Sequence, residues 1–439
     1  MKRKIVLIGA GSSVFGPSMF SDLYLNDNLD GSTIVLVDID AEKLEMIYDI
    51  LCNENEQAGK KFVLERTTDR RVALHDADFV ISSVEPKRFH FRWQDHSIPL
   101  KHGARTRMGE CGGPGGFFHS ARIIPIVMDI MRDVNEICPD AYFINFSNPV
   151  ARISLAAHRL FPDIKYVGLC HQIEFLNNHL PKMFDCELDE LKITVTGLNH
   201  FGFLIGLEKW KSGEDLMPEF NHRCLEYFKD KWDKFGFDQF TFEVFERFGY
   251  FPHPGDNHLC EYIQFADEFV LVEDLKEWIQ LMEESGKSVD RKIRRYHRKL
   301  SEGKSPKKSL LRSTPSGEQA IPIIEAIVTN TRMYDPSVNI PNSGLVTNLP
   351  QNLVIETPAW IDGDGIHGIK IGDLPKNIAG LLRIEATIQD MCVEAILQKS
   401  KSLAINCLSM DTKVGSISMA EKIFDELYTM QKDYLPKFT

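Results

Sequence analysis

The first 38 residues of the chain contain a strand, a glycine-rich turn, a helix, a second strand and an acidic residue, in that order. Ile5–Ile8 is a short apolar run that leads directly into the turn Gly9–Val14, and a second apolar run, Thr33–Val37, ends at Asp38. In this arrangement glycine allows a tight turn and a close approach of a pyrophosphate, while the helix N-terminus attracts the phosphate charge. The pattern predicts an α/β fold with a Rossmann-type, mostly parallel sheet that binds a dinucleotide.

The cofactor expected for this sheet is NAD. Asp38 stands where a carboxylate can accept hydrogen bonds from ribose hydroxyls, which favours NAD over NADP. Val14 replaces the third glycine of the usual pattern, so the packing of the helix on the strand is less well defined. The alternative is a glycine-rich turn that binds nothing. The expected cofactor-binding residues are Gly9, Gly11, Ser12, Val14, Asp38, Ser82 and Val84.

Two further apolar runs, Asp78–Val84 and Tyr142–Asn148, are predicted strands that end in polar loops. Asn148 precedes Pro149 at such an end, where its amide is placed to contact the nicotinamide ribose or a sugar hydroxyl. An Asn-Pro turn without a function explains the same residues equally well.

A cysteine and a histidine stand at the ends of two more predicted strands. Cys170 closes the run that begins at Tyr166, and His200 follows the apolar stretch that ends at Leu198. A thiolate and an imidazole are good ligands for divalent transition metals, and two protein ligands leave positions open for water and substrate. His171 is suited to proton transfer at neutral pH. The alternative is a buried cysteine beside structural histidines.

The segment from Pro254 to Tyr262 concentrates titratable side chains after a Gly/Pro turn. Asp256, His258 and Tyr262 are therefore candidates for acid–base chemistry. The alternative for Asp256 is that it caps the helix that follows.

Composition narrows the partners and the compartment. The 439 residues carry a formal net charge of −12, which argues against nucleic acid, because phosphate binding needs a basic face. The basic stretch Arg291–Lys308 is interpreted as a solvated helix face, or as a lid or subunit contact near an anionic substrate. Nine cysteines without paired spacing, and no apolar run long enough for a membrane, predict a cytoplasmic protein with reduced thiols and no membrane partner.

With these residues in view, the chain resembles the family 4 glycoside hydrolases, the NAD- and manganese-dependent glycosidases that share the fold of lactate and malate dehydrogenases. The resemblance covers nearly the whole chain. Its markers, besides the segments above, are Leu36–Asp40, Gly112–Gly116, Ser147–Pro149, Val338–Gly344, Asn348–Pro350 and Gly372–Pro375.

The resemblance implies a redox-assisted elimination. NAD would transiently oxidise the sugar 3-hydroxyl, a base would remove the C2 proton, the glycosidic oxygen would leave with help from an acid, and water and hydride would be added back. The implied metal is Mn²⁺ or another divalent ion on Cys170 and His200. His171, which follows the cysteine, is the implied proton donor and substrate contact, and Asn148 contacts the sugar.

The resemblance leaves the base among three residues. It places the base in the loop around Gly255–His258, where Asp256 is the first choice. Other branches of the family use a tyrosine at the position of His258, and Tyr262 is a further candidate.

One departure from the family concerns the substrate. Members that act on 6-phosphorylated glycosides carry an arginine at the position occupied here by Glu85, and a carboxylate repels phosphate. We therefore expect a non-phosphorylated, α-linked glycoside. Arg105 and Arg107 remain compatible with a uronic acid, or are ordinary surface charge.

The sequence thus predicts an NAD-binding domain over residues 1–195 and an α+β domain over 196–439 that holds substrate and metal. The resemblance further implies a homodimer or homotetramer. The rival interpretation is an NAD-dependent 2-hydroxy acid dehydrogenase of malate or lactate type. That enzyme would use His200 for acid–base chemistry and would have no use for Cys170.

Overall fold

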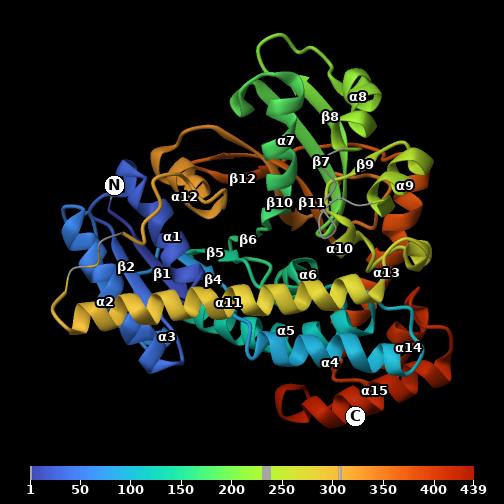
Figure 1. Ribbon diagram of the computed structural model, residues 1–439, viewed down its shortest axis with the longest axis horizontal. Helices are drawn as coiled ribbons and strands as arrows, with labels where there is room; N and C mark the ends of the chain where they lie inside the picture. The colour runs from blue at the N-terminus through green and yellow to red at the C-terminus, as the bar shows by residue number, and fades with distance from the viewer. Residues whose placement is uncertain (1, 230–238, 305, 307–308) are drawn as a thin grey trace.

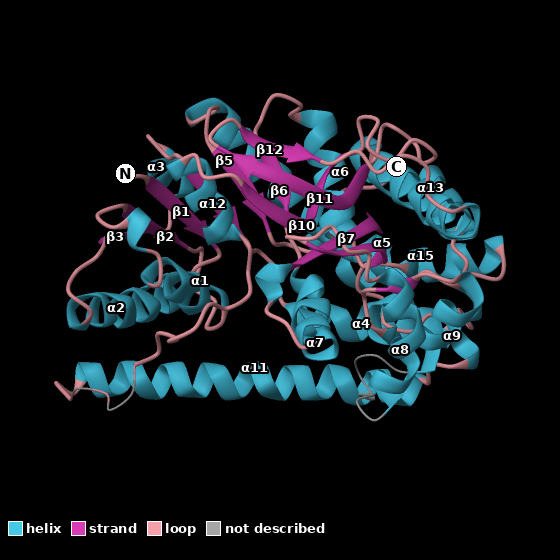
Figure 2. Ribbon diagram, turned by 90° about the horizontal axis from the view of Figure 1, so that it is seen from above, coloured by secondary structure: helices cyan, strands magenta, loops and turns pink. Residues whose placement is uncertain are grey.

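The computed structural model describes residues 2–229, 239–304, 306 and 309–439. Its strands are β1 (Lys4–Ile8), β2 (Thr33–Val37), β3 (Val63–Thr67), β4 (Phe79–Ser82), β5 (Tyr142–Asn145), β6 (Tyr166–Gly168), β7 (Leu191–Leu198), β8 (Phe201–Lys209), β9 (Phe251–Pro252), β10 (Met333–Pro341), β11 (Val354–Asp362) and β12 (Gly365–Gly368). They form one sheet in the order β3-β2-β1-β4-β5-β6-β10-β11-β7-β8-β9, with β12 paired to β11. Figure 2 shows the strands of this sheet in magenta, between the helices.

The first six strands are parallel and confirm the predicted Rossmann-type half. Successive residues of β1 enter different cores, because side chains alternate across a strand: Val6 packs in one hydrophobic cluster, and Ile5 and Leu7 pack in another. The helices that connect these strands are α1 (Phe15–Tyr24), α2 (Ala41–Gln57), α3 (Arg70–Leu74), α4 (Arg88–Lys101), α5 (Gly113–Ile137) and α6 (Val150–Leu160). Helices thus cover both faces, as a parallel sheet requires.

The second half continues the same sheet with antiparallel strands. β10 joins β6 where Asn339 pairs with Gly168, and β7 joins β11 where Gly197 pairs with Glu356. The predicted domain boundary between residues 195 and 196 lies inside β7. The helices of this half are α7 (Glu174–Phe184), α8 (Met217–Lys229), α9 (Gln239–Phe248), α10 (Asp256–Leu259), α11 (Val272–Ser301), α12 (Ala320–Thr329), α13 (Lys376–Gln398), α14 (Lys401–Met410) and α15 (Ile417–Gln431).

Helix α11 runs along the outside of the molecule, from the second half back to α2 (Figure 1). The Tyr296 hydroxyl donates to Glu54 of α2, and the Ser13 hydroxyl of the glycine-rich turn donates to Asp290 at 2.9 Å. The basic stretch Arg291–Lys308 begins in the C-terminal part of α11, where Arg294 pairs with Asp290 at 2.9 Å, and continues beyond the end of the helix at Ser301. Ser305, Lys307 and Lys308 of that stretch lie outside the described residues. In the described part of the chain, no helix is both long and apolar enough to cross a membrane.

Candidate active site

The glycine-rich turn has the geometry of a phosphate-binding turn. Gly9 has φ of +91°, and a Cβ there would overlap the carbonyl oxygen of Ser83, so the turn passes directly against the residues that follow β4. The Gly11 N–H donates to Asp38 Oδ2 at 2.8 Å. Ser12 Oγ accepts from the Val14 and Phe15 N–H groups at 3.3 and 3.2 Å and holds the first amides of α1.

Apolar side chains flank this turn on the outside. Val14 is 56 % exposed, and Ile39, next to Asp38, is 94 % exposed. An apolar face beside a ribose-binding acid suits a base ring. The structure therefore brings together the N-terminal residues predicted for NAD, and Ser82 and Val84 lie beside Gly9, with the Val84 N–H donating to Ser147 Oγ at 2.8 Å.

A substitution at Gly11 tests this turn. A Cβ at residue 11 would lie 2.8 Å from the carboxylate of Asp38, so Gly11→Ala displaces the group expected to receive the ribose. We expect the NAD dissociation constant to rise about tenfold or more, by the loss of one charged hydrogen bond. Titration of NAD by protein fluorescence measures this, and Gly380→Ala in α13, whose Cβ would meet nothing within 4 Å, is the control. Unchanged NAD affinity in Gly11→Ala would contradict the assignment.

The metal candidates converge at the edge of the sheet. Cys170 follows β6, and His200 stands in the turn between β7 and β8 with φ of +64°. Cys170 Sγ lies 3.3 Å from His200 Nε2. A thiolate and an imidazole bound to one ion at about 2.3 and 2.1 Å would be separated by about this distance. The pair is therefore spaced to bind a metal ion together. Among the described residues, no group of three or more His, Cys, Asp or Glu side chains is arranged to hold one, so the protein would supply two ligands. An open, catalytic coordination is consistent with two ligands.

Burial sets the protonation of the two candidate ligands. Desolvation, helped by Glu356, raises the pKa of the Cys170 thiol to about 12. Desolvation, helped by His258, lowers the pKa of His200 well below its usual value. At neutral pH the pair is therefore a thiol and a neutral imidazole, and only the thiol has a proton to lose when a cation binds.

This difference predicts a pH dependence for metal binding. Because the thiol pKa of about 12 lies above the working range, each pH unit raises the thiolate fraction tenfold, and His200 adds no further proton. We expect the Mn²⁺ dissociation constant to fall about tenfold per pH unit between pH 6 and 8, with about one proton released per ion. Calorimetry in buffers of different ionisation enthalpy measures both. Release of two protons, or a constant affinity, would show that the donor pair differs.

Glu356 organises the turn that carries His200, and the motif analysis did not include it among the site residues. Its carboxylate accepts from Asn199 Nδ2 at 3.0 Å and from Ser337 Oγ at 2.8 Å, and it lies 2.7 Å from His253 Nε2. The pKa of Glu356 is lowered: burial opposes ionisation, but His253 and the hydrogen bonds outweigh it. An acid inside the largely apolar run Val354–Trp360 was the available signal.

The three candidates for the base lie in different surroundings. Asp256 is buried, and its carboxylate accepts from the N–H groups of Phe240 and Thr241, at 3.2 and 2.7 Å, and from the Thr241 hydroxyl. It therefore caps α9 instead of the helix that follows. Tyr262 is also buried, and its ring stacks on Phe201 at 5.1 Å between centroids.

His258 is the candidate nearest to the metal pair. Its ring centroid lies 4.0 Å from that of His200, and its Nδ1 is buried without a hydrogen-bond partner. Desolvation lowers the pKa of His258 to about 4, so the imidazole is neutral and can accept a proton.

Four charged side chains lie near His200 and His258: Glu85 after β4, Arg88 and Arg92 on α4, and Glu110 just before α5. Glu110, buried, pairs with Arg92, lies 3.8 Å from Arg88, and accepts from Asn148 Nδ2 at 3.4 Å. Burial opposes the ionisation of Glu110, but Arg92 and Arg88 outweigh it and hold its pKa far below the usual value. Arg88 also pairs with Glu85 at 3.1 Å. Glu110 and Arg92 were missed by motif reasoning; the position of Glu110 just before the glycine run was the signal.

Asn148 and His171 present free donor or acceptor atoms to the same region. Asn148 Oδ1 is buried without a partner, which leaves an acceptor for a hydroxyl group. His171 is 69 % exposed, and its Nδ1 lies 3.9 Å from Glu318 Oε1.

A Rossmann-type sheet continued by antiparallel strands is the arrangement of the malate dehydrogenase fold. The malate dehydrogenase of Aeropyrum pernix superposes with a TM-score of 0.52 at 12 % identity, over 89 % of this chain and 97 % of that one. The family 4 glycosyl hydrolase model matches residues 4–186, and the C-terminal domain model of the same family matches residues 195–414. The chain belongs to the family 4 glycosyl hydrolases, as its motifs predicted.

Relatives match over the full length. An alpha-glucosidase of Erwinia rhapontici is 33 % identical, over 99 % of both chains, and an alpha-galactosidase of Bacillus subtilis (strain 168) is 31 % identical, over 99 % of this chain and 100 % of that one. A 6-phospho-alpha-glucosidase from gut microorganisms, solved in complex with NAD and Mn²⁺, has a TM-score of 0.88 at 22 % identity, with both chains fully covered.

Proposed function

We propose that the protein hydrolyses non-phosphorylated, α-linked glycosides with the help of NAD and a divalent metal, Mn²⁺ first among those to test. The observation that carries the proposal is the convergence of Cys170 and His200 on one point at the sheet that also bears the glycine-rich turn. A dehydrogenase of the same fold would need the turn but not the thiol.

Each bound group has its own residues. The turn from Gly9 to Ser12 would hold the pyrophosphate of NAD, Asp38 the ribose, and Cys170 with His200 the metal. When bound, NAD supplies a reversible hydride acceptor and the metal a Lewis acid for the sugar oxygens. Asn148 Oδ1, unpaired and buried, accepts a hydrogen bond from a sugar hydroxyl and orients the ring.

Two histidines handle the protons. We assign His258 as the base for the C2 proton, because its neutral imidazole lies against His200, where the sugar C2 and C3 oxygens would be held. His171, in the open part of the site, donates a proton to the glycosidic oxygen. Asp256 acts indirectly, since its carboxylate fixes the start of α9 and so the loop that carries His258.

The charges of Glu85, Arg88, Arg92 and Glu110 favour a neutral sugar. Arg88 is shared by Glu85 and Glu110, and Arg92 pairs with Glu110, so carboxylates already balance both guanidinium groups. Arg107 donates to the main-chain carbonyl of Val270 at 2.7 Å, and so has a structural task. The names of the 33 % and 31 % identical relatives support α-linked, unphosphorylated substrates.

We also propose a cytoplasmic homodimer or homotetramer. In the described structure all nine cysteines are free thiols, as a reducing compartment requires.

Exposed apolar residues on α13 and α15, among them Ile384 and Ile417, support a contact between copies. Analytical ultracentrifugation tests the assembly, and a monomer at micromolar concentration would refute it.

The function is tested with nitrophenyl α-glucoside, α-galactoside and α-galacturonide, in the presence of NAD, Mn²⁺ and a thiol reductant. We expect turnover of a neutral glycoside without net NADH, loss of activity on chelation, and slower turnover of substrate deuterated at C2. Stoichiometric NADH formation from malate or lactate, without glycoside cleavage, would identify a dehydrogenase instead. Full activity after chelation would refute the metal assignment.

A further inference from the structure

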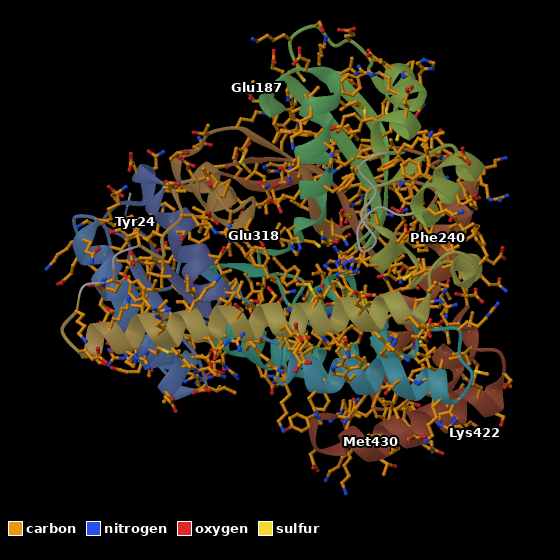
Figure 3. The ribbon with its side chains drawn as sticks, viewed as in Figure 1. Tyr24, Glu187, Phe240, Glu318, Lys422 and Met430 are labelled. Atoms are coloured by element: carbon orange, nitrogen blue, oxygen red, sulfur yellow. The ribbon has the colours of Figure 1, made fainter. Side chains whose placement is uncertain are left out.

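Glu318 stands opposite His171, although it comes from a distant part of the chain. It lies just before α12, near the centre of the molecule in the view of Figure 3. Its Oε1 is 3.9 Å from His171 Nδ1, and its side chain is only 25 % exposed, whereas that of His171 is 69 % exposed. A largely buried carboxylate thus faces one nitrogen of an open imidazole.

The backbone that carries Glu318 is fastened on two sides. The Ser316 N–H and hydroxyl both donate to Asp22 of α1, the N–H at 2.8 Å, and the Glu318 N–H donates to Ser316 Oγ at 3.1 Å. Gly317 has φ of +93°, and a Cβ there would overlap the carboxylate of Glu174 at the start of α7. The carboxylate of Glu318 is therefore held at a fixed place between α1 and the turn that bears His171.

We propose that Glu318 is a positioning residue that orients the imidazole of His171 for proton donation. Its carboxylate attracts the Nδ1–H, which leaves Nε2 pointing into the open part of the site. The Nε2 proton passes to the glycosidic oxygen as the C1–O bond breaks, the aglycone leaves as an alcohol, and water returns a proton to Nε2. The inference rests on the proposed role of His171. A carboxylate behind a histidine limits the ring to one orientation, and such contacts tighten when substrate binds.

Leaving-group dependence separates a positioning role from a structural one. A nitrophenolate leaves without protonation, whereas the alkoxide of a methyl glycoside needs an acid. In Glu318→Gln, which keeps the size of the side chain but removes its charge, we expect kcat for the methyl α-glycoside to fall about tenfold, with KM unchanged. This is less than the roughly 10²- to 10⁴-fold of a general acid itself, because Glu318 acts only through His171. For the nitrophenyl glycoside of the same sugar, kcat stays within about twofold. Glu325→Gln, on the outer part of α12, is the control and leaves both rates unchanged.

The double variant shows whether Glu318 acts through His171. In the His171→Ala background, Glu318→Gln is expected to have no further effect on the ratio of the two rates. If His171→Ala itself lowers both rates equally, the proposed role of His171 fails. If His171→Ala is selective for the methyl glycoside but Glu318→Gln lowers both rates equally, or raises KM alone, the positioning role of Glu318 is overturned. NAD affinity and the unfolding midpoint of Glu318→Gln, expected to match the wild type, exclude a folding defect as the cause.

Discussion

Replacing Cys170 by serine is expected to abolish glycosidase activity and to raise the Mn²⁺ dissociation constant about a hundredfold or more, since even residues that only support a metal ligand contribute ten- to a hundredfold. The hydroxyl of serine keeps its proton at neutral pH and is a poor ligand, and His200 alone remains at 3.3 Å from the vacated sulfur position. NAD affinity should not change, because the glycine-rich turn is a separate site. Electron paramagnetic resonance of free Mn²⁺ measures the loss.

Cys138→Ser provides the matched control, because Cys138 is a free thiol like Cys170 but stands at the far end of α5. It should bind Mn²⁺ as the wild type does. Normal Mn²⁺ affinity in Cys170→Ser would show that the cation binds elsewhere.

His258→Gln is expected to lower the catalytic rate, whereas Asp256→Ala is expected to lower the stability of the fold. Loss of the base lowers kcat by about 10²- to 10⁴-fold in His258→Gln and stops exchange of the C2 hydrogen with solvent. Asp256→Ala leaves two buried N–H groups and one hydroxyl of α9 without their acceptor, so the free energy of unfolding falls by roughly 3 kcal/mol. The Asp256→Ala protein that remains folded should still catalyse C2 exchange.

Proton exchange followed by NMR, together with denaturant unfolding, distinguishes the two variants. Glu246→Gln, at an exposed position of the same helix as Thr241, controls for general effects on α9. If Asp256→Ala abolished C2 exchange at unchanged stability while His258→Gln retained it, Asp256 would be the base after all.

The parallel half of the fold could be predicted because its signals are local. The run Ile5–Ile8 forms the buried end of β1, and Thr33–Val37 forms β2 with the predicted bounds. Short apolar runs between turns are typical of buried strands. Cys170 and His200 could each be predicted to follow a strand, but their meeting depends on the tertiary pairing of Gly168 with Asn339, of Asn339 with Glu356 and of Glu356 with Gly197.

The rest of the candidate site depends on tertiary contacts between distant residues, which no local sequence pattern predicts. Glu110 faces Asn148 and Arg92 across separate elements, and Glu318 reaches His171 from 147 positions away in the chain. A carboxylate such as Asp256 looks alike in sequence whether it serves as a base or caps a helix, and only the position of Phe240 and Thr241 distinguishes the two. The motifs therefore mark the region of the chemistry, while the division of labour follows from tertiary packing.

The pairing of Asn339 with Gly168 joins the two halves of the sheet within two residues of Cys170. A main-chain ladder, and not a hinge, therefore sets the spacing between the dinucleotide turn and the thiol. We therefore expect differences in sugar preference to arise from side chains and loops around the site, with the sheet unchanged. Variation at Glu85 or Arg88 can then alter what is accepted while the reacting centre stays where the ladder holds it.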